Sequence, residues 1–545
     1  MVELRRRARR GSRGIRRVVD GARGLGPSVT LAWAARRATT RHSPRHENTS
    51  FTWVIADHGT TTIAWLHNYW SDAYGIDRPE LSAELFDRSG ASVACWSVGL
   101  EPDETISIDI RERCRAHGVR LPFEGQLLLR LIDDKLMGGR PVQVFAEYER
   151  DDGESTGVHG QYGEMGVPAA QVVSAMRVEA GRGHRTAVIV TNPYNGPGGP
   201  TSMRAELTVL SADGRHRRAR LPAVAPRATH RVYVDEVFPD LAGFLGREPG
   251  HIRLKLPCPS SRVSTLVEYD DGRCIANHGT VDRVFDQGAG RPVGSAEPGP
   301  VASAFVICDD RRETELTLPN VWGPVAGEYE AQIDVFASDG RHLVTQTVPV
   351  PRDGLAQVRM KPVLRRAGVP LPTVAHAQVS VRPAGQVDEW PATFDVLVGL
   401  LKGDELVGEV QVGSDFYNSP VPAGVRWPDI RRTRVFGRVR VDGGHRTYVF
   451  LSHPVAGQDH GAPACPRLTL VSSDGTRKLT HQVELPVHGC LLAEVTDLFP
   501  EAPQFLGATG SGTLRVRDTD ARLYGFYFVE SDHARTVPVC HLIGG

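Results

Sequence analysis

A chain of 545 residues is too long to fold around one hydrophobic core, and its length predicts about three to five domains. The hydrophobic share of 40% and the charged share of 23% are typical of a globular protein and exclude disorder over most of the chain. The formal net charge is zero but unevenly divided. Residues 1–47 hold thirteen Arg, no Lys and three acidic residues, a net charge of +10, so the rest of the chain carries −10.

Residues 1–47 are predicted to form a basic tail that is either disordered or an amphipathic helix. Ile15, Val18, Val19 and Ala22 would share one face of such a helix, whereas the glycines between the arginines disfavour it. We expect the tail to bind an anionic surface, although the acidic remainder of the chain competes for the same positive charge. The arginines that carry this prediction are Arg5, Arg6, Arg7, Arg9, Arg10, Arg13, Arg16 and Arg17.

Two features bear on cellular location. The sequence has no stretch of about 20 apolar residues that would span a membrane, and its N-terminal segment lacks the apolar core of a secretory signal. The eight Cys include no C-x-x-C and occupy no shared position in the repeats described next, which favours reduced thiols. We therefore predict a cytoplasmic protein, with peripheral membrane attachment and secretion left open.

Four hairpin signals recur along the chain. Each is a β-rich run, a tight turn that ends in glycine and a returning β-rich run. The turns are Ser89-Gly90, Asp213-Gly214, Asp339-Gly340 and Asp474-Gly475, and their glycines are 124, 126 and 135 residues apart. An even period of this kind indicates repeated structural units.

Each repeat contains short β-rich runs, turn signals about every 8 to 12 residues and almost no helical periodicity. This pattern predicts an all-β protein of four tandem antiparallel β-sandwich domains. The predicted segments are the tail 1–47, the sandwiches 48–168 and 169–286, the linker 287–300, and the sandwiches 301–422 and 423–545.

Repeats two and four are the most alike. The run GHRT at Gly183 is mirrored at Gly444, and the run VDEVFPDLAGFLG at Val234 is mirrored by VTDLFPEAPQFLG at Val495. The latter runs are predicted to form a short helical turn or a loop that crosses one end of the sandwich. Since repeats one and two differ from each other as three and four do, the four repeats are interpreted as a duplicated pair.

A family resemblance rests on the Asn-Pro after the first strand of repeat two, the Asp-Gly hairpins, the proline-marked return and the closing aromatic strand. Together these resemble the tandem Ig-like sandwich repeats of bacterial surface and adhesion proteins, over most of residues 51–545. The resemblance implies a non-catalytic binding or scaffolding function. The expected partner is another protein, a glycan or an anionic surface, with no sequence-specific nucleic acid and no cofactor.

The opening of the first repeat, FTWVIADHGTTTIAWLHNYW, gathers aromatic and histidine residues. Two interpretations stay open. Such residues fill the strands of a sandwich core, or they form an exposed site that binds a sugar ring or a partner protein. In the second case paired histidines would also suit a carbohydrate-active or metal-dependent enzyme, the alternative function. The candidate residues are Trp53, His58, Trp65, His67, Asn68, Tyr69 and Trp70.

A histidine lies near the end of repeats one, two and four, namely His159, His278 and His541, while repeat three has Tyr417-Asn418 instead. If the three imidazoles converge, they supply the three or four ligands that a metal site needs. Alternatively, each histidine forms a hydrogen bond that closes its own sandwich, which would explain why the position recurs.

The tail prediction is testable by truncation. The full chain is expected to bind anionic vesicles more tightly than a chain that starts at Asn48, because about 1 kcal/mol accompanies each arginine near an anionic surface. Binding to vesicles and to duplex DNA should weaken between low and physiological salt, and cosedimentation at the two salt concentrations measures this. Equal binding by the truncated chain would contradict the prediction.

Overall fold

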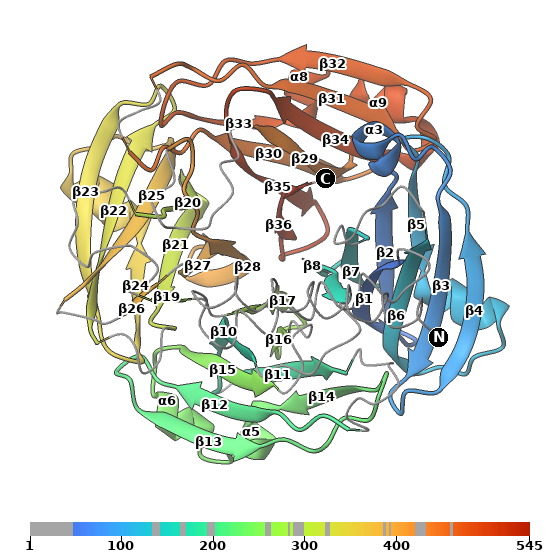
Figure 1. Ribbon diagram of the computed structural model, residues 1–545. Coiled ribbons are helices and arrows are strands. Elements are labelled where there is room, and N and C mark those ends of the chain that lie inside the picture. Colours follow the sequence, from blue (N-terminus) through green and yellow to red (C-terminus); the bar gives the residue numbers. More distant parts are fainter. Residues whose placement is uncertain are drawn as a thin grey trace, which may run out of the picture.

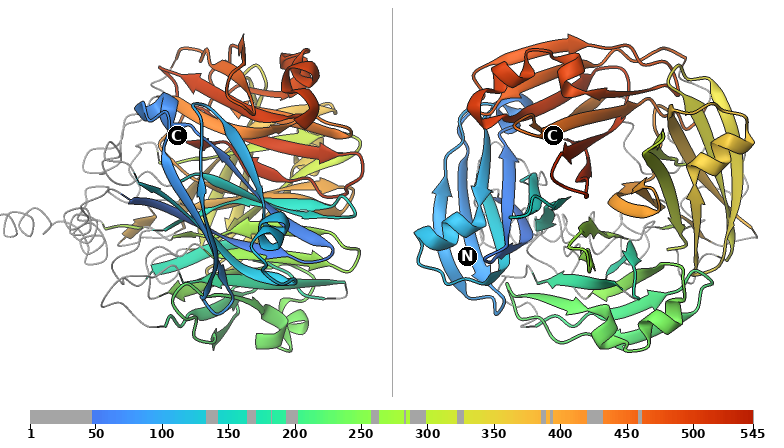
Figure 2. Two further views of the ribbon diagram at one scale, coloured as in Figure 1. Left: turned by 90° about the vertical axis from the view of Figure 1, so that its right-hand side faces the viewer. Right: turned by 180° about the vertical axis from the view of Figure 1, so that it is seen from behind.

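The computed structural model describes residues 47–132, 142–163, 171–181, 183–192, 202–256, 263–281, 284–286, 299–321, 327–384, 389–391, 394–419, 432–457 and 461–544. Strands predominate within these ranges and helices are short, so the predicted all-β class is confirmed. Figure 1 shows the sheets arranged in a ring around a central axis, and Figure 2 shows the ring from the side and from behind. We divide it by its strands into unit 1 (β1–β9), unit 2 (β10–β18), unit 3 (β20–β28) and unit 4 (β29–β37).

Unit 1 is built on one sheet of nine strands. Its main path runs β4-β3-β6-β1-β2-β7-β8, with β5 paired to β2 and β9 paired to β1. The elements are β1 Glu47–Ala56, β2 Thr60–His67, α3 Trp70–Tyr74, β3 Glu80–Asp87, β4 Ser92–Val98, β5 Thr105–Asp109, α4 Ile110–Ala116, β6 Phe123–Ile132, β7 Val144–Arg150, β8 Ser155–His159 and β9 Gln161–Gly163.

Unit 2 has two sheets, ordered β13-β12-β15-β10-β18 and β14-β11-β16-β17. Its elements are β10 Gln171–Val178, β11 His184–Thr191, β12 Glu206–Leu210, β13 His216–Arg220, β14 Thr229–Tyr233, α5 Val234–Val237, α6 Leu241–Leu245, β15 Gly250–Leu256, β16 Ser264–Tyr269, β17 Cys274–His278 and β18 Thr280–Val281. The short strand β19, Val284–Asp286, follows and pairs with β26 of unit 3.

Unit 3 repeats this plan with sheets ordered β20-β25-β22-β23 and β24-β21-β27-β28. Its elements are β20 Ala302–Cys308, β21 Arg312–Pro319, β22 Tyr329–Ala337, β23 His342–Val350, β24 Leu355–Arg359, α7 Met360–Arg366, β25 Thr373–Pro383, β26 Glu389–Pro391, β27 Asp395–Lys402 and β28 Glu405–Gly413.

Unit 4 has sheets ordered β32-β31-β34-β29-β37 and β33-β30-β35-β36. Its elements are β29 Thr433–Arg440, β30 His445–Ser452, β31 Arg467–Ser472, β32 Lys478–Gln482, β33 Cys490–Glu494, α8 Val495–Leu498, α9 Ala502–Leu506, the 3-10 helix Gly507–Thr509, β34 Ser511–Asp518, β35 Tyr524–Ser531, β36 Val539–His541 and β37 Ile543–Gly544.

Apart from α3 in unit 1, the helices alternate around the ring. Units 1 and 3 each carry one seven-residue helix after their fifth strand, α4 and α7. Units 2 and 4 each carry a pair of short helices, α5 with α6 and α8 with α9, at the segments predicted to be short helical turns or loops. This alternation is what a duplicated pair of repeats predicts. The residue limits proposed for the four domains stay a prediction, and the tail 1–46 and the linker 287–298 lie outside the described residues.

The four hairpins lie on the outer rim of the ring, where Figure 1 shows β4, β13, β23 and β32, while β8, β17, β28 and β36 lie nearest the axis. Alternation of buried and exposed side chains explains this placement. On β22, for example, Ala331, Ile333 and Val335 are fully buried while the residues between them are not. This strand therefore presents one apolar face to its sandwich core and one more polar face outward.

The ring is closed by contacts between each hairpin turn and the next unit. A Cβ added at Gly340 would overlap the carbonyl oxygen of Val487 in unit 4, and one at Gly214 would overlap that of Arg352 in unit 3. The same relation joins Gly90 to unit 2 and Gly475 back to unit 1. The evenly spaced glycines thus mark the places where backbone meets backbone between units, which only a residue without a side chain allows.

Each receiving segment contains one residue with a left-handed backbone. These residues are Asp103 (φ 63°), Arg227 (φ 62°), Asp353 (φ 57°) and His488 (φ 61°). At two junctions a buried histidine of the preceding unit lies on the carbonyl oxygen of that residue: His251 Nε2 is 3.0 Å from the oxygen of Asp353, and His376 Nδ1 is 3.1 Å from that of His488. Burial lowers the pKa of each of these two imidazoles to about 3, so each ring is neutral and donates one N–H to the carbonyl.

The junction between units 4 and 1 is ionic instead. Arg515 and Lys478 of unit 4 both contact the carboxylate of Asp103. Burial alone would raise the pKa of Asp103, but hydrogen bonds from Lys478 and Arg515 outweigh it and lower the pKa to about 2. This carboxylate therefore stabilises the closed ring above its ordinary pKa and loses that contribution as the pH falls toward 2.

Two further sequence predictions concern thiols and membrane segments. Seven cysteines fall within the described residues and all are free, whereas Cys258 lies outside them. No helix in the described ranges is long and apolar enough to cross a membrane.

The closure contact is testable with a matched pair of glycine substitutions. Gly340 and Gly403 both have positive φ (84° and 66°), but only Gly340 faces backbone of another unit, since no described atom lies within 4 Å of a Cβ at Gly403. Gly403→Ala is expected to cost about 1–2 kcal/mol through backbone strain alone. Gly340→Ala is expected to cost at least about 2 kcal/mol more, measured by thermal unfolding. Equal costs would contradict the closure role.

Candidate metal centre

The four innermost strands, β8, β17, β28 and β36, surround the axis in the order of the units, each beside the next. Side chain and backbone atoms join them directly. The backbone N–H of Ala276 on β17 donates to Thr156 Oγ1 on β8 over 2.8 Å, and Cys540 Sγ on β36 lies 3.8 Å from the oxygen of Gly157 on β8. The ends of strands from different units are therefore held at fixed positions around one point.

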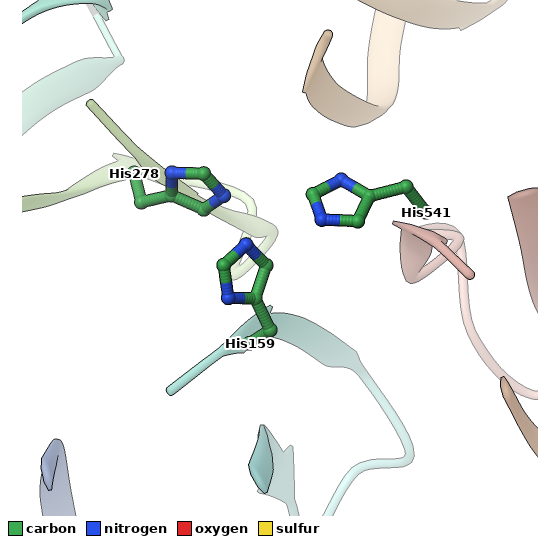
Figure 3. Close-up of side chains that lie close together, drawn as sticks. All are labelled: His159, His278 and His541. Carbon is green, nitrogen blue, oxygen red and sulfur yellow. The ribbon is translucent and has the colours of Figure 1, made fainter. Parts of the chain in front are cut away.

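Three histidines project from these strand ends toward one another (Figure 3). They are His159 at the end of β8, His278 at the end of β17 and His541 at the end of β36. One ring nitrogen of each lies within 4.8 Å of those of the other two. A tetrahedral centre with metal–nitrogen bonds of about 2.0–2.1 Å places its ligand nitrogens about 3.3–3.4 Å apart, so the most separated of these nitrogens need to approach by about 1.5 Å at most.

The ring centroids describe three corners of a square. His159 lies 4.2 Å from His278 and 4.7 Å from His541, while the two outer rings are 6.1 Å apart. The two shorter distances and the longer one are in the proportion of two sides and a diagonal. This is the geometry expected when three of four units around a pseudo-fourfold axis each contribute one side chain.

Both sequence interpretations of these histidines describe part of the arrangement. His159 Nδ1 lies 3.1 Å from the carbonyl oxygen of Gly160, and His278 Nδ1 lies 3.3 Å from that of Gly279. A neutral imidazole that donates from Nδ1 to a backbone carbonyl presents Nε2 as an acceptor or metal ligand. The local hydrogen bond therefore orients each ring, and the convergence of the rings creates the site.

The position equivalent to these histidines in unit 3 is Gly413, which corrects the sequence assignment of Tyr417-Asn418. In units 1, 2 and 4 the residue that follows the histidine donates its backbone N–H to a carbonyl oxygen of the neighbouring strand. That carbonyl belongs to the residue just before the one that pairs with the histidine. In unit 3 the donor in that position is Ser414, which bonds to the oxygen of Phe394 over 2.9 Å. Tyr417 and Asn418 lie four and five residues further on, and Asn418 donates instead to the oxygen of Pro454.

Buried ion pairs fix the surrounding strands. Glu409 on β28 accepts from Asn277, the residue before His278, over 2.9 Å and from Arg177 over 2.6 Å. Arg177 also contacts Glu179 and Glu315, so one guanidinium joins units 2 and 3. Burial lowers the pKa of Arg177, but the charges of the three carboxylates outweigh it and hold that pKa above its ordinary value.

A second buried pair lies on the other side of the axis. Arg438 of unit 4 contacts Glu147 of unit 1, and both side chains are almost fully buried. These arginines and carboxylates carried no motif in the sequence. The available signal was the placement of Arg177 and Arg438 inside β-rich runs, each directly between two apolar or small residues.

The aromatic cluster of repeat one is not an exposed surface. Trp65 and Trp70 are fully buried, Trp53 and Tyr69 are 4% exposed, and Tyr69 stacks on Phe436 of unit 4. Trp65, Tyr69 and Trp70 form part of a core shared by units 1 and 4, whereas Trp53 packs in a smaller core with residues of unit 2. The core interpretation therefore describes their placement, and an exposed aromatic binding site does not.

The histidines predicted at the same opening do not meet. His58 lies exposed in the turn between β1 and β2, whereas His67 is fully buried with its Nε2 3.0 Å from Arg515 Nε. Burial and the nearby Arg515 charge lower the pKa of His67 well below its ordinary value. Asn68 is also buried and donates to the oxygens of Asp77 and Glu101. The predicted arginine cluster in the tail lies outside the described residues.

No family model matches this chain, and no curated protein matches it. Among solved structures it is similar to a glycosyl hydrolase family 2 member from Bacteroides cellulosilyticus, at 11% identity over 46% of this chain and 29% of that chain, with a TM-score of 0.12. It is also similar to the CupB6 tip adhesin from Pseudomonas aeruginosa, at 11% identity over 50% of this chain and 88% of that chain, with a TM-score of 0.12. The chain thus spans less than a third of the length of the hydrolase, and such TM-scores assign neither a fold family nor a function.

The ion pairs beside the axis are testable with matched arginine variants. Arg177→Met leaves three partly or fully buried carboxylates without their shared cation, and it is expected to cost about 3–5 kcal/mol of unfolding free energy. Arg185→Met removes a half-exposed arginine paired with Asp235, and it should cost less than about 1 kcal/mol. Chemical denaturation of both variants makes the comparison, and similar costs would contradict the structural role of Arg177.

Proposed function

We propose that this chain is a metal-binding protein in which the ring of four units holds one divalent transition metal, with zinc as the favoured ion, at its axis. The observation that supports this is the convergence of His159, His278 and His541 from three different units. The binding function implied by the sequence resemblance becomes, in this proposal, the binding of a metal.

The ligand chemistry supports a transition metal over calcium or magnesium. Imidazole nitrogen suits zinc, copper, nickel and iron, whereas calcium and magnesium take oxygen ligands. Two carboxylates, those of Glu147 on β7 and Glu409 on β28, do not compete for the metal, because each is paired with a buried arginine. Three imidazoles oriented by backbone carbonyls match the outer-shell pattern of histidine-bound metals.

The metal would also act as a structural link. The three ligands come from units 1, 2 and 4, which are joined otherwise by hairpin contacts and buried ion pairs. An ion bound only by the closed ring stabilises that ring, by about 2.7 kcal/mol when its free concentration is 100 times its dissociation constant. We propose further that each unit is a tandem Ig-like domain within the limits given above, supported by the recurring pair of sheets in units 2, 3 and 4.

The proposal predicts stoichiometric zinc binding. The full chain, treated with chelator and then dialysed against micromolar zinc, should retain one zinc ion per chain by elemental analysis and should unfold at a higher temperature than the stripped chain. His159→Ala and His541→Ala should each weaken zinc binding by more than the roughly 10- to 100-fold that outer-shell partners cost.

The matched control is His58→Ala. His58 is exposed and is not one of the three clustered histidines, and it belongs to the alternative site predicted from the sequence, so this variant should bind zinc as the unaltered chain does. Loss of zinc in His58→Ala but not in His159→Ala would place the metal at the opening of unit 1 and overturn the proposal. Absence of stoichiometric zinc in the unaltered chain would overturn it as well.

A further inference from the structure

The three histidines leave one corner of the axial square without a side chain. That corner belongs to unit 3, where the strand pairing aligns Gly413 with the histidines: Gly413 lies opposite Asp395 as His159 lies opposite Phe145. Its strand, β28, lies between the strands that carry His278 and His541. Among the described residues, the cluster of possible metal ligands contains the three histidines alone.

The space at this corner can hold a small ligand. A Cβ built on Gly413 would contact only Asp395 Oδ1, at 3.5 Å, among the described atoms within 4 Å. The backbone of Gly413 is not among those with positive φ, so glycine is not needed there for conformation. Among the described atoms, the lack of a side chain at Gly413 therefore leaves room at the corner. The backbone conformation of the strand does not require glycine at this position.

Solvent reaches the same side of the site. His159 and His278 are 3% and 4% exposed, whereas His541 and Gly413 are each partly exposed. The corner without a histidine therefore coincides with the accessible edge of the cluster. A zinc site with three protein ligands and an accessible fourth position binds water or another exogenous ligand there, whereas a structural site is closed by four protein ligands.

We propose that the axial metal has an open coordination position at the Gly413 corner, filled by water that a small monovalent anion can displace. This inference rests on the proposed metal site. The charges favour such an anion, because a divalent ion with three neutral imidazoles retains net positive charge even beside the carboxyl of Asp395, the group that the described atoms place at this corner. Asp395, held by the amide of Gln411, is placed to accept a hydrogen bond from the bound water.

The test uses cobalt(II) as a coloured replacement for zinc and azide as the anion. Cobalt bound to the full chain should show visible absorption that changes on azide addition and saturates. Gly413→His places a fourth imidazole at the corner, so it should bind cobalt but lose the azide-dependent change at concentrations that saturate the unaltered chain. Gly413→Ala adds only a methyl group and should keep the azide response within about threefold.

The outcomes separate this inference from the proposed function. If the unaltered chain binds cobalt through the histidines but its spectrum ignores azide, the fourth position is closed, for instance by Asp395, and the open-site inference is overturned while the metal site stands. If cobalt does not bind, the proposed function fails first. Should Gly413→His not fold by circular dichroism, the Asp395→Asn variant takes its place: azide binding that becomes tighter, as a negative charge is removed, supports the open corner, and unchanged binding contradicts it.

Discussion

The arrangement depends on close backbone contact between each hairpin turn and the next unit. Four turn glycines meet four segments that carry one left-handed residue each, and the last contact returns from Gly475 to the segment at Asp103. Because every unit both inserts a turn and receives one, the chain closes on itself, and no hairpin contact is left unmatched among the four. Closure in turn fixes the distance of every inner strand from the axis, so side chains more than a hundred residues apart in sequence can share a single point.

The axis then concentrates chemistry that no single unit contains. One histidine from a unit is a hydrogen-bonded side chain at a strand end, as His159 is with the oxygen of Gly160. Three such strand ends around an axis make a nitrogen cluster, and the buried pairs of Arg177 with Glu409 and of Arg438 with Glu147 hold the strands that carry it. A metal bound here would connect three units at once. Unit 3 has Gly413 at the position where the other units have a histidine. A metal bound by the three histidines would therefore have an open fourth position rather than a closed one.

Much of the local structure was readable from the sequence, and the site was readable only in part. The Asp-Gly turns, the short helical turn at Val495 and the recurring terminal histidines follow from local rules of turn chemistry and periodicity. Convergence of the histidines did not follow, because it depends on closure between distant units. Gly413 was missed because a glycine carries no side chain that marks it as the counterpart of a histidine, and the strand pairing that aligns it with the histidines is not visible in the sequence. The aromatic residues at Trp65 and Trp70 were ambiguous in sequence, since core and surface sites use the same residue types.

The central claim is that three histidines from three units hold one metal at the axis. The most direct measurement is an anomalous difference map from crystals of the zinc-loaded full chain, collected on both sides of the zinc absorption edge. The account predicts a single strong peak between His159, His278 and His541, about 2.0–2.1 Å from one nitrogen of each ring. A peak elsewhere in the molecule, or three histidine rings ordered around a centre without anomalous signal, would contradict it.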